Sequence, residues 1–350
     1  MILPRVAYYA HHHGTGHLRH AVAIARLQVV DLLVTGSTEP PGLSDIPHTR
    51  FAQLTTDVAP DGEPFPVPPE PFLHYTPTTS TIRDRFSQLH AAWHEFNPQV
   101  VIIDVSAEAA VFARLCGYPV LYRRMPGDRS DVAHQTAYAA ATGLFAYYPA
   151  ALEDPAYRDA DGGRTQYLGM LDPTRSTSTR TAASASGKVI AVQTSLGGTG
   201  VSVAEITRAA RSCPEWQWNV VGLSSGNADL PPNVRLLGVL EDPRPELSAA
   251  DLIITSAGYH AVAAAAAAGR PTILVPEERP FGEQLAFARA LNRSAGIPMA
   301  ETWSAAAWPD LLRQAVESDA GALRAALFVS SDTFSDRLLD LVSRASVTGS

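Results

Sequence analysis

The chain has 350 residues, 46% of them hydrophobic and 18% charged, which is a globular composition long enough for two domains of about 150 residues. Its formal charge of −8 argues against a nucleic-acid partner and against electrostatic docking on anionic lipid. The two cysteines, Cys116 and Cys213, lie in different halves and supply neither a disulfide framework nor a zinc ligand set.

Residues 1–5 run directly into a strand-like segment without the pattern of a secretory signal. The longest apolar stretch, residues 261–268, is far shorter than the ~20 residues of a membrane span. We therefore expect a cytoplasmic protein with no transmembrane segment. The abundance of alanine and scarcity of lysine suggest a GC-rich bacterial source, for which specialised-metabolite or cell-envelope chemistry is plausible.

Short apolar runs alternate with helical patterns in the first half. The expected strands are 6–10, 31–35, 100–104 and 120–123, and the expected helices are 18–28, 81–96 and 108–115. This alternation is typical of parallel sheets built from βαβ units, so we expect a doubly wound core. Residues 59–79 carry many prolines and are expected to form a long loop.

The second half restarts the pattern. Strands are expected at 188–193, 217–221, 234–237, 251–255 and 272–275, with helices at 203–211, 259–268 and 282–292. Residues 172–187 are too polar and too small to pack a core, which predicts a linker. We therefore expect domains at 1–171 and 188–332, followed by an amphipathic helix at 333–344 and a fraying tail to residue 350.

Each half opens on a glycine-rich turn after its first strand. The first turn contains Gly14, Thr15, Gly16 and His17, and the second contains Ser195, Gly197 and Gly198. Small residues let a ligand approach the backbone, and the helix start offers free N–H groups and a positive dipole end.

A dinucleotide-binding fingerprint is disfavoured in the first turn, because Arg19 stands where that motif needs its third glycine. Two such turns in successive α/β domains are a stronger signal than one. Ligands bind beyond the carboxyl ends of parallel strands, so the two rims are expected to face one cleft.

The string Gly-Thr-Gly-His at 14–17, the string Ser-Ala-Gly-Tyr-His at 256–260, residues 268–276 and Gln284 carry a resemblance. They are similar to the GT-B glycosyltransferases related to the peptidoglycan lipid-intermediate N-acetylglucosaminyltransferase, with a family 28-like C-terminal domain. The resemblance covers nearly the whole chain. It implies an α/β GT-B fold, in which two Rossmann-like open parallel-sheet domains face an interdomain cleft, with acceptor bound by the first domain and nucleotide-sugar donor by the second.

The resemblance also assigns site residues. Its donor side comprises Ser195, Gly197, Gly198, Val239, Leu240, Ser256, Gly258, Tyr259, Glu283 and Gln284. From the first turn and the loop at 127–134 we expect the acceptor side to comprise Gly14, Thr15, Gly16 and His134. In this assignment the nucleotide base lies against the backbone of 239–240, and residues 283–284 reach the sugar hydroxyls. The remaining donor residues surround the diphosphate: Ser195, Gly197, Gly198, Ser256, Gly258 and Tyr259. Ala264 departs from the family, which usually has a glutamate for the ribose there.

Glycosyl transfer needs a base for the acceptor proton. His17 is the leading candidate, because a histidine with a pKa of ~6.5 is mostly neutral at pH 7. The alternative is that it only caps its helix. Asp104, at the end of a strand, either orients His17, contacts the acceptor or caps the next helix. His134 is a second candidate base, or part of an acceptor-side loop at 127–134.

Backbone amides and a helix N-terminus can stabilise the leaving diphosphate without a cation. The one Asp-x-Asp pair, Asp159 and Asp161, is expected in a solvated loop. In an extended segment the side chains of His11 to His13 point in alternating directions, which disfavours a shared metal ion. We therefore expect no metal and no cofactor, with the nucleotide-diphosphate-sugar as co-substrate.

The leading hypothesis is an inverting, metal-independent transfer from a nucleotide-diphosphate-sugar, with uridine expected and thymidine left open, to a small-molecule or cell-envelope acceptor. A nucleotide-sugar hydrolase or epimerase is the enzymatic alternative, because residues 16–19 also resemble hydrolases of activated sialic-acid-like sugars. A non-catalytic accessory protein is the third hypothesis, because Ala264 stands where the family usually has its ribose-binding glutamate. The oligomeric state is left open, a homodimer included.

Overall fold

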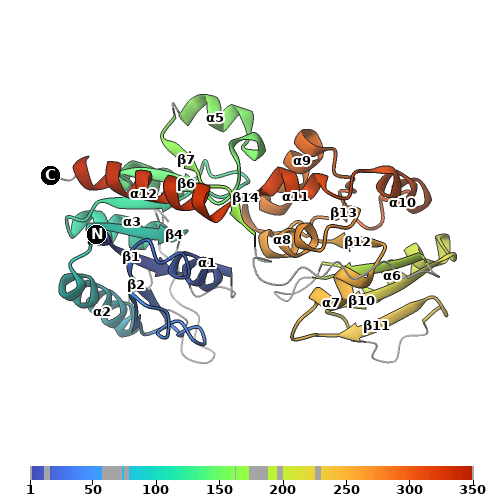
Figure 1. Cartoon of the computed structure of the whole chain (residues 1–350), viewed down its shortest axis with the longest axis horizontal. Coiled ribbons are helices and arrows are strands. Elements are labelled where there is room, and N and C mark those ends of the chain that lie inside the picture. The colour runs from blue at the N-terminus through green and yellow to red at the C-terminus, as the bar shows by residue number, and fades with distance from the viewer. Residues whose placement is uncertain are drawn as a thin grey trace.

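The computed structural model describes residues 2–11, 16–56, 73–74, 79–161, 163–172, 188–194, 200–224 and 230–348. Two parallel sheets, each covered by helices on both faces, lie side by side (Figure 1). Of the linker expected at 172–187, only Asp172 is within the described residues, and most of the proline-rich loop expected at 59–79 also lies outside them. The expected α/β fold with two open parallel sheets is confirmed.

The first sheet has seven parallel strands in the order β3-β2-β1-β4-β5-β6-β7. Their bounds are Arg5–Ala10 (β1), Asp31–Gly36 (β2), Thr49–Gln53 (β3), Val100–Asp104 (β4), Val120–Arg123 (β5), Gly143–Ala146 (β6) and Thr165–Tyr167 (β7). The order reverses between β1 and β4, where Ala10 pairs with Asp104 at the carboxyl ends. In open α/β sheets such a reversal is the place where ligands bind.

Helices cover both faces of this sheet because its central strands are apolar on both sides. On one face pack α2 (Ser80–Phe96), α3 (Ala107–Leu115) and α4 (Val132–Ala140), through residues such as Leu89, Trp93 and Ala137. On the other face packs α1 (Gly16–Ala25), through Ala21 and Ile24. The short helices η1 (Ala150–Leu152) and α5 (Pro155–Asp161) follow β6.

The second sheet has five parallel strands in the order β11-β10-β9-β12-β13. Their bounds are Lys188–Gln193 (β9), Trp216–Val221 (β10), Val234–Gly238 (β11), Leu252–Thr255 (β12) and Thr272–Leu274 (β13). The order reverses between β9 and β12. Each domain therefore has its own switch point, next to the first strand of its sheet.

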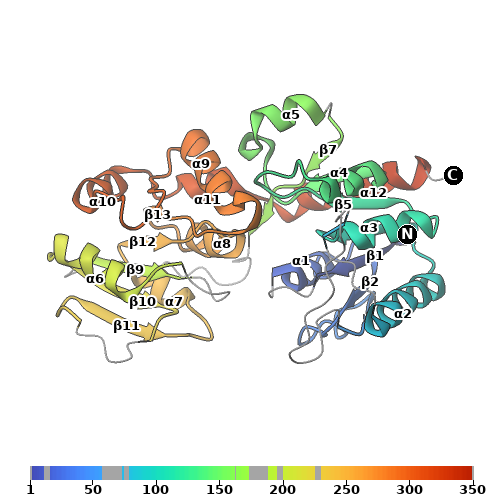
Figure 2. The same cartoon turned by 180° about the vertical axis from the view of Figure 1, so that it is seen from behind.

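The helices of the second domain also form two layers (Figure 2). One layer contains α7 (Arg244–Ala249), α8 (Tyr259–Ala268), α9 (Glu283–Ala295) and α11 (Ala322–Leu327), and the other contains α6 (Val203–Ser212) and α10 (Trp308–Glu317). The turn η2 (Pro280–Gly282) leads into α9. Alanines make α8 narrow enough to pack closely on the sheet, as its burial at Val262, Ala263, Ala265 and Ala266 shows.

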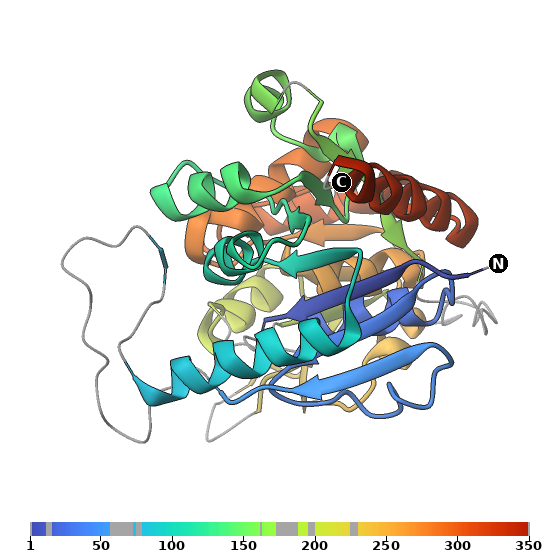
Figure 3. The ribbon, with the colours of Figure 1, turned by 90° about the vertical axis from the view of Figure 1, so that its left-hand side faces the viewer.

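The last helix, α12 (Ser331–Thr348), returns to the first domain (Figure 3). Its apolar face, which includes Phe334, Leu338 and Leu341, lies in the core that contains β1 and β4. Just before it, β14 (Phe328–Val329) pairs in parallel with β8 (Met170–Leu171). The amphipathic helix expected at 333–344 is thus part of α12, and its apolar side packs in the core of the first domain.

The structure corrects two expectations about local structure. Residues 127–134 are not a continuous loop, because Asp131 accepts from the His134 N–H and caps α4 at its start. Asp159 lies within α5 and not in a solvated loop. Strands β3, β6 and β7 and helices α4, α5, α7, α10 and α11 had no expected counterpart.

Among the described helices, none combines the length and the apolar character needed to cross a membrane.

Candidate functional site

The first switch point brings His17 and Asp104 together. His17 is the second residue of α1, which follows β1, and Asp104 ends the neighbouring strand β4. Their side chains meet with His17 Nδ1 2.9 Å from Asp104 Oδ2. The histidine side chain keeps 16% of its surface exposed, while the aspartate side chain is fully buried. The imidazole is thus partly accessible, and its Nδ1 is directed at a buried carboxylate.

Asp104 does not cap the following helix. That role belongs to Ser106, whose Oγ accepts from the Ala109 N–H at 3.1 Å. The Asp104 carboxylate instead accepts from Tyr8 OH at 2.8 Å and from Arg123 Nη1 at 2.8 Å. Burial acts to raise the pKa of Asp104, but Arg123 and His17 outweigh it and hold that pKa well below its usual range. A charged carboxylate therefore stands behind His17.

Two further histidines lie beside this pair. His20 is stacked on Tyr147 with ring centroids 4.2 Å apart, and its ring is 5.1 Å from that of His260 in α8. Burial, with Arg123 adding to it, lowers the pKa of His20 well below its usual value. Burial and then Arg19 lower the pKa of His260 to about 4. Both rings are neutral at pH 7, so neither competes with His17 for the charge of Asp104.

The second switch point presents the N-terminus of α8. Gly258 is its N-cap, and no side chain of the described residues caps it, so its first N–H groups are available to an anion. Ser256 is buried at 4% exposure, and its Oγ has no hydrogen-bond partner among the described residues. A buried hydroxyl that no described residue pairs with, beside a helix start that no described side chain caps, fits a phosphate-binding position.

Gln284 reaches the same place from α9. Its Oε1 accepts from the Glu277 N–H at 2.9 Å, and its Nε2 lies 3.4 Å from the position of a Cβ at Gly258. Space for a larger residue at Gly258 is therefore limited. The structure thus brings together Ser256, Gly258, Tyr259 and Gln284, four of the donor residues that the resemblance implied.

The two switch points face each other across a direct contact between domains. His260 Nε2 lies 3.2 Å from the carbonyl oxygen of Gly16, at the start of α1. Tyr259 OH donates to the carbonyl oxygen of Tyr147, just after β6, at 2.9 Å. The N-termini of α1 and α8, one from each domain, therefore meet next to the His17 and Asp104 pair.

The other implied donor residues are more dispersed. Val239 and Leu240 follow β11 on the same carboxyl side of the second sheet, and Val239 is 66% exposed. The implied turn residues Gly14, Thr15, Ser195, Gly197 and Gly198 lie outside the described residues. Ala264 is partly buried against the second domain's core.

Residues 127–134 of the first domain and 281–283 of the second form what we call the interdomain clasp. Asp128 N–H donates to the Phe281 carbonyl oxygen at 2.9 Å, and Arg129 Nη2 lies 2.9 Å from Glu283 Oε2. The Phe281 ring packs edge-on against His134, with centroids 4.8 Å apart. The implied residues His134 and Glu283 therefore meet in this clasp, next to Gln284.

His134 also belongs to a cluster with His74 and Asp131 whose ligand atoms lie within 4.8 Å of one another, a set that could hold a metal ion. Asp131 links the rings: its Oδ2 is 2.5 Å from His134 Nδ1 and its Oδ1 is 3.0 Å from His74 Nε2.

The tautomer at His134 argues against a metal in this cluster. Arg129 Nη1 lies 3.3 Å from His134 Nε2, and a guanidinium can only donate, so Nδ1 carries the ring proton and points it at Asp131. A metal ligand would need that nitrogen deprotonated, and the Arg129 charge would also repel the cation. Burial, the largest cause, lowers the pKa of His134 to about 4.

Sequence reasoning missed Arg123, Tyr8 and the clasp residues Arg129 and Phe281. Arg123 was visible as a charged residue ending the apolar strand β5, at the same carboxyl edge as Asp104. Tyr8 lies within an apolar run, so only the structure shows its hydroxyl on Asp104. The clasp joins segments that lie far apart in the sequence, 154 residues apart for Arg129 and Glu283, and no local pattern indicates it.

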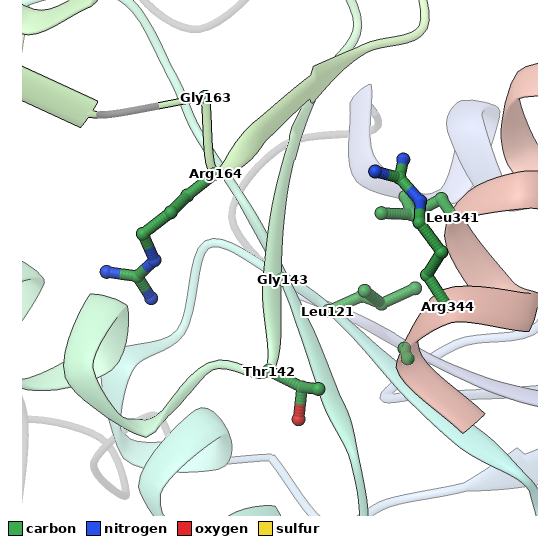
Figure 4. A pocket seen from close by; sticks show the side chains of 8 residues that line it. Leu121, Thr142, Gly143, Gly163, Arg164, Leu341 and Arg344 are labelled. Carbon is green, nitrogen blue, oxygen red and sulfur yellow. The ribbon is translucent and has the colours of Figure 1, made fainter. Parts of the chain in front are cut away.

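A cavity of about 200 Å³ lies elsewhere, between α12 and the amino ends of β5 and β6. Leu121 points toward α12 in this cavity, while Arg164 extends away from it (Figure 4). The Arg164 side chain donates to the Tyr138 carbonyl oxygen at 2.9 Å. The cavity is at the opposite edge of the sheet from His17 and Asp104 and does not belong to the site.

Comparisons with known proteins concern the fold and the second domain. Residues 217–318 match the model of the glycosyltransferase family 28 C-terminal domain. No curated protein matches the chain.

Three solved structures illustrate the likeness. MurG from Acinetobacter baumannii is 18% identical with a TM-score of 0.61, over 97% of this chain and 100% of that one. Spinosyn rhamnosyltransferase SpnG, complexed with thymidine diphosphate, is 17% identical with a TM-score of 0.60, over 96% of each chain. UGT2 of Phytolacca americana, complexed with UDP-2-fluoro-glucose and pterostilbene, is 17% identical with a TM-score of 0.66, over 98% of this chain and 99% of that one.

At these identities the structures establish the fold. Together with the domain match they confirm the resemblance to GT-B glycosyltransferases and support the prediction of a glycosyltransferase.

Proposed function

We propose that this GT-B protein is an inverting glycosyltransferase that moves a sugar from a nucleoside-diphosphate donor to an acceptor deprotonated by His17. The observation that carries the proposal is the meeting of two half-sites. A histidine hydrogen-bonded to a buried carboxylate, from the first domain, lies beside a helix N-terminus of the second that no described side chain caps. One half-site can take a proton and the other can hold a diphosphate.

In the proposed reaction the acceptor X–H gives its proton to Nε2 of His17. The acceptor atom attacks the anomeric carbon, and the bond from that carbon to the diphosphate oxygen breaks, so the electron pair leaves on the nucleoside diphosphate. Asp104 stabilises the imidazolium that forms, since its carboxylate faces Nδ1. The backbone N–H groups at the start of α8 stabilise the departing charge, which is why we propose that no metal is needed.

The donor assignment extends the same proposal. Ser256, Gly258 and Tyr259 hold the diphosphate, Gln284 and Glu283 contact the sugar, and the exposed backbone at Val239 and Leu240 borders the base. Structures of SpnG with thymidine diphosphate and of UGT2 with a UDP-sugar leave uridine and thymidine as the two bases to test. For the acceptor, the named ligands of these proteins favour a small aglycone over a macromolecule.

The test begins with calorimetric titration of UDP, TDP and their sugars, followed by product analysis with the tightest donor. His17→Ala should lower transfer by about 10²–10⁴-fold, because the proton acceptor is lost, while donor affinity stays nearly unchanged. His94→Ala, an exposed histidine of α2, is the matched control and should transfer normally. Unchanged turnover of His17→Ala would remove the base assignment.

Two outcomes would favour the alternatives on this fold. Release of nucleotide at a rate that no acceptor changes would indicate a nucleotide-sugar hydrolase. Absence of nucleotide-sugar binding at millimolar concentration would indicate an accessory protein, consistent with Ala264 in place of a ribose ligand.

A further inference from the structure

We infer that Arg123 is a positioning residue, which clamps the Asp104 carboxylate from behind and thereby sets how strongly that carboxylate draws a proton onto His17. The inference rests on the proposed base role of His17. It concerns a residue that neither the motifs nor the family resemblance pointed to. Its basis is the arrangement of charges around one buried carboxylate.

Asp104 is shared by donors on opposite sides. Arg123 Nη1 lies 2.8 Å from Oδ1, whereas Tyr8 OH and His17 Nδ1 lie 2.8 and 2.9 Å from Oδ2. The two carboxylate oxygens are therefore divided between the guanidinium and the catalytic histidine. The guanidinium holds Oδ1 through Nη1, which leaves Oδ2 to face the Tyr8 hydroxyl and the imidazole.

Arg123 is itself held in place. Its side chain is 4% exposed, and its guanidinium carbon lies over the rings of Tyr147 and Tyr259, 4.9 and 5.5 Å from their centroids. Tyr147 belongs to the first domain and Tyr259 begins α8 of the second. The clamp is thus built between the half-site that takes the proton and the half-site that holds the diphosphate.

The groups that face His17 and Asp104 leave Arg123 as the buried counter-charge. Burial raises the pKa of Tyr8 on β1, of Tyr147 and of Tyr259 on α8, so all three stay protonated. Burial keeps His20 of α1 and His260 of α8 neutral by lowering their pKa values. Arg19 on α1 is exposed, and His11 lies with its ring centroid 5.8 Å from that of His17.

Asp104 and Arg123 therefore already cancel each other before His17 takes a proton. A carboxylate with no other partner would hold a protonated imidazole strongly and leave little neutral base at pH 7. Sharing that carboxylate with a guanidinium weakens this hold. The arrangement keeps His17 oriented by a negative charge without trapping it as an imidazolium.

The experiment is an NMR titration of His17 in the free full-length protein, carried out beside the pH profile of kcat/KM. Arg123→Met and Arg123→Gln remove the charge, and both should move the His17 midpoint and the acid limb of the profile upward by about one pH unit or more. Arg123→Lys keeps the charge and should leave both close to those of the native protein. Donor affinity should change little in all three variants.

Arg124→Met is the matched control, because Arg124 is a neighbouring buried arginine that pairs with Glu153 at 3.2 Å and does not touch Asp104. It should leave the His17 midpoint unchanged, whatever it does to stability. A midpoint that stays in place in Arg123→Met and Arg123→Gln would overturn the inference. So would failure of both neutral variants to fold while Arg124→Met folds, because Arg123 would then be a structural residue.

The NMR titration separates this inference from the proposed function. A shifted midpoint in a protein that transfers no sugar would keep the role of Arg123 and reject the transferase. Normal transfer with an unshifted midpoint would do the reverse.

Discussion

The hydroxyl group of Ser256 offers a direct test of the proposed donor site. Its Oγ is buried and has no hydrogen-bond partner among the described residues. Such a buried hydroxyl lowers the stability of the free protein, but it can donate a hydrogen bond to a phosphate oxygen of the bound donor. Ser256→Ala should therefore lower nucleoside-diphosphate affinity by about 10-fold or more, the loss of one hydrogen bond to a charged group. The free protein should be as stable as before, or up to about 1 kcal/mol more stable.

Calorimetry with UDP and TDP, beside thermal unfolding of the free protein, checks this expectation. Ser212→Ala is the control, because the Ser212 Oγ donates to the Ala209 carbonyl oxygen at 2.7 Å at the far end of α6. It should leave affinity unchanged. Loss of stability without loss of affinity in Ser256→Ala would show that the hydroxyl serves the fold alone.

At the level of elements, the clasp depends on a close backbone approach at Gly127. Its φ is +93°, and a Cβ there would lie 2.3 Å from the Phe281 carbonyl oxygen. That atom is backbone and cannot swing away, so Gly127→Ala must push the two domains apart or distort the turn before α9. We expect it to lower both stability and transfer activity, because the displaced segment carries Glu283 and Gln284.

Gly117→Ala isolates the backbone part of this effect. Gly117 has a similar φ of +86°, but a Cβ there would meet nothing within 4 Å. It should lose about 1–2 kcal/mol from the positive φ alone and keep full activity. Urea unfolding and kcat/KM of the two variants measure the difference, and equal losses in both would mean that the clasp does not hold the domains together.

The elements that sequence predicted well are those with strong local signals. Strands such as Val100–Asp104 read as apolar runs, and α8 reads as an alanine-rich helix after a Ser-Ala-Gly turn. Helix α4 was missed because its start depends on Asp131 as a cap, inside a segment that otherwise reads as a turn. Strand β3 was missed because its burial pattern is mixed, with an exposed Arg50 and Gln53.

The same division applies to the site. His17, Asp104 and Ser256 lie at strand ends or helix starts, and these are the positions where ligands bind in parallel sheets, so the order of strands and helices along the chain is enough to suggest them. Arg123 and the clasp depend on which strand neighbours which and on how the two domains meet. Strand order and domain contacts join residues far apart in the sequence, and the local periodicity of a single sequence does not indicate them.

On the scale of the whole molecule, the chain crosses between its domains twice and the second crossing closes the fold. The pairing of β14 with β8 brings the returning segment beside the outgoing one. Helix α12 then supplies Phe334, Leu338 and Leu341 to the core of the first domain, where Phe334 stacks on Tyr147 with centroids 6.1 Å apart. Tyr147 is also the residue whose carbonyl oxygen accepts from Tyr259, so it contacts both the returning helix α12 and the start of α8.

The contact between His260 and the Gly16 carbonyl oxygen makes the domain interface sensitive to acid. Burial and then Arg19 lower the pKa of His260 to about 4, whereas an unfolded histidine titrates near ~6.5. Between these pH values the unfolded state binds a proton that the folded state does not, so stability falls as pH falls. At pH 5 the titration of His260 therefore lowers the free energy of unfolding by about 2 kcal/mol.

His260→Gln keeps a donor for the Gly16 carbonyl oxygen but cannot be protonated, so it should flatten the decline in melting temperature between pH 7.5 and pH 5. The exposed His94→Gln, on α2, should leave the decline as it is in the native protein. His260 joins the two domains, and its protonated form is repelled by Arg19 and Arg123. Protonation of His260 should therefore separate the two domains before either core unfolds. Hydrogen exchange at pH 5 should then rise first at the starts of α1 and α8, and simultaneous exposure of both sheets would contradict this order.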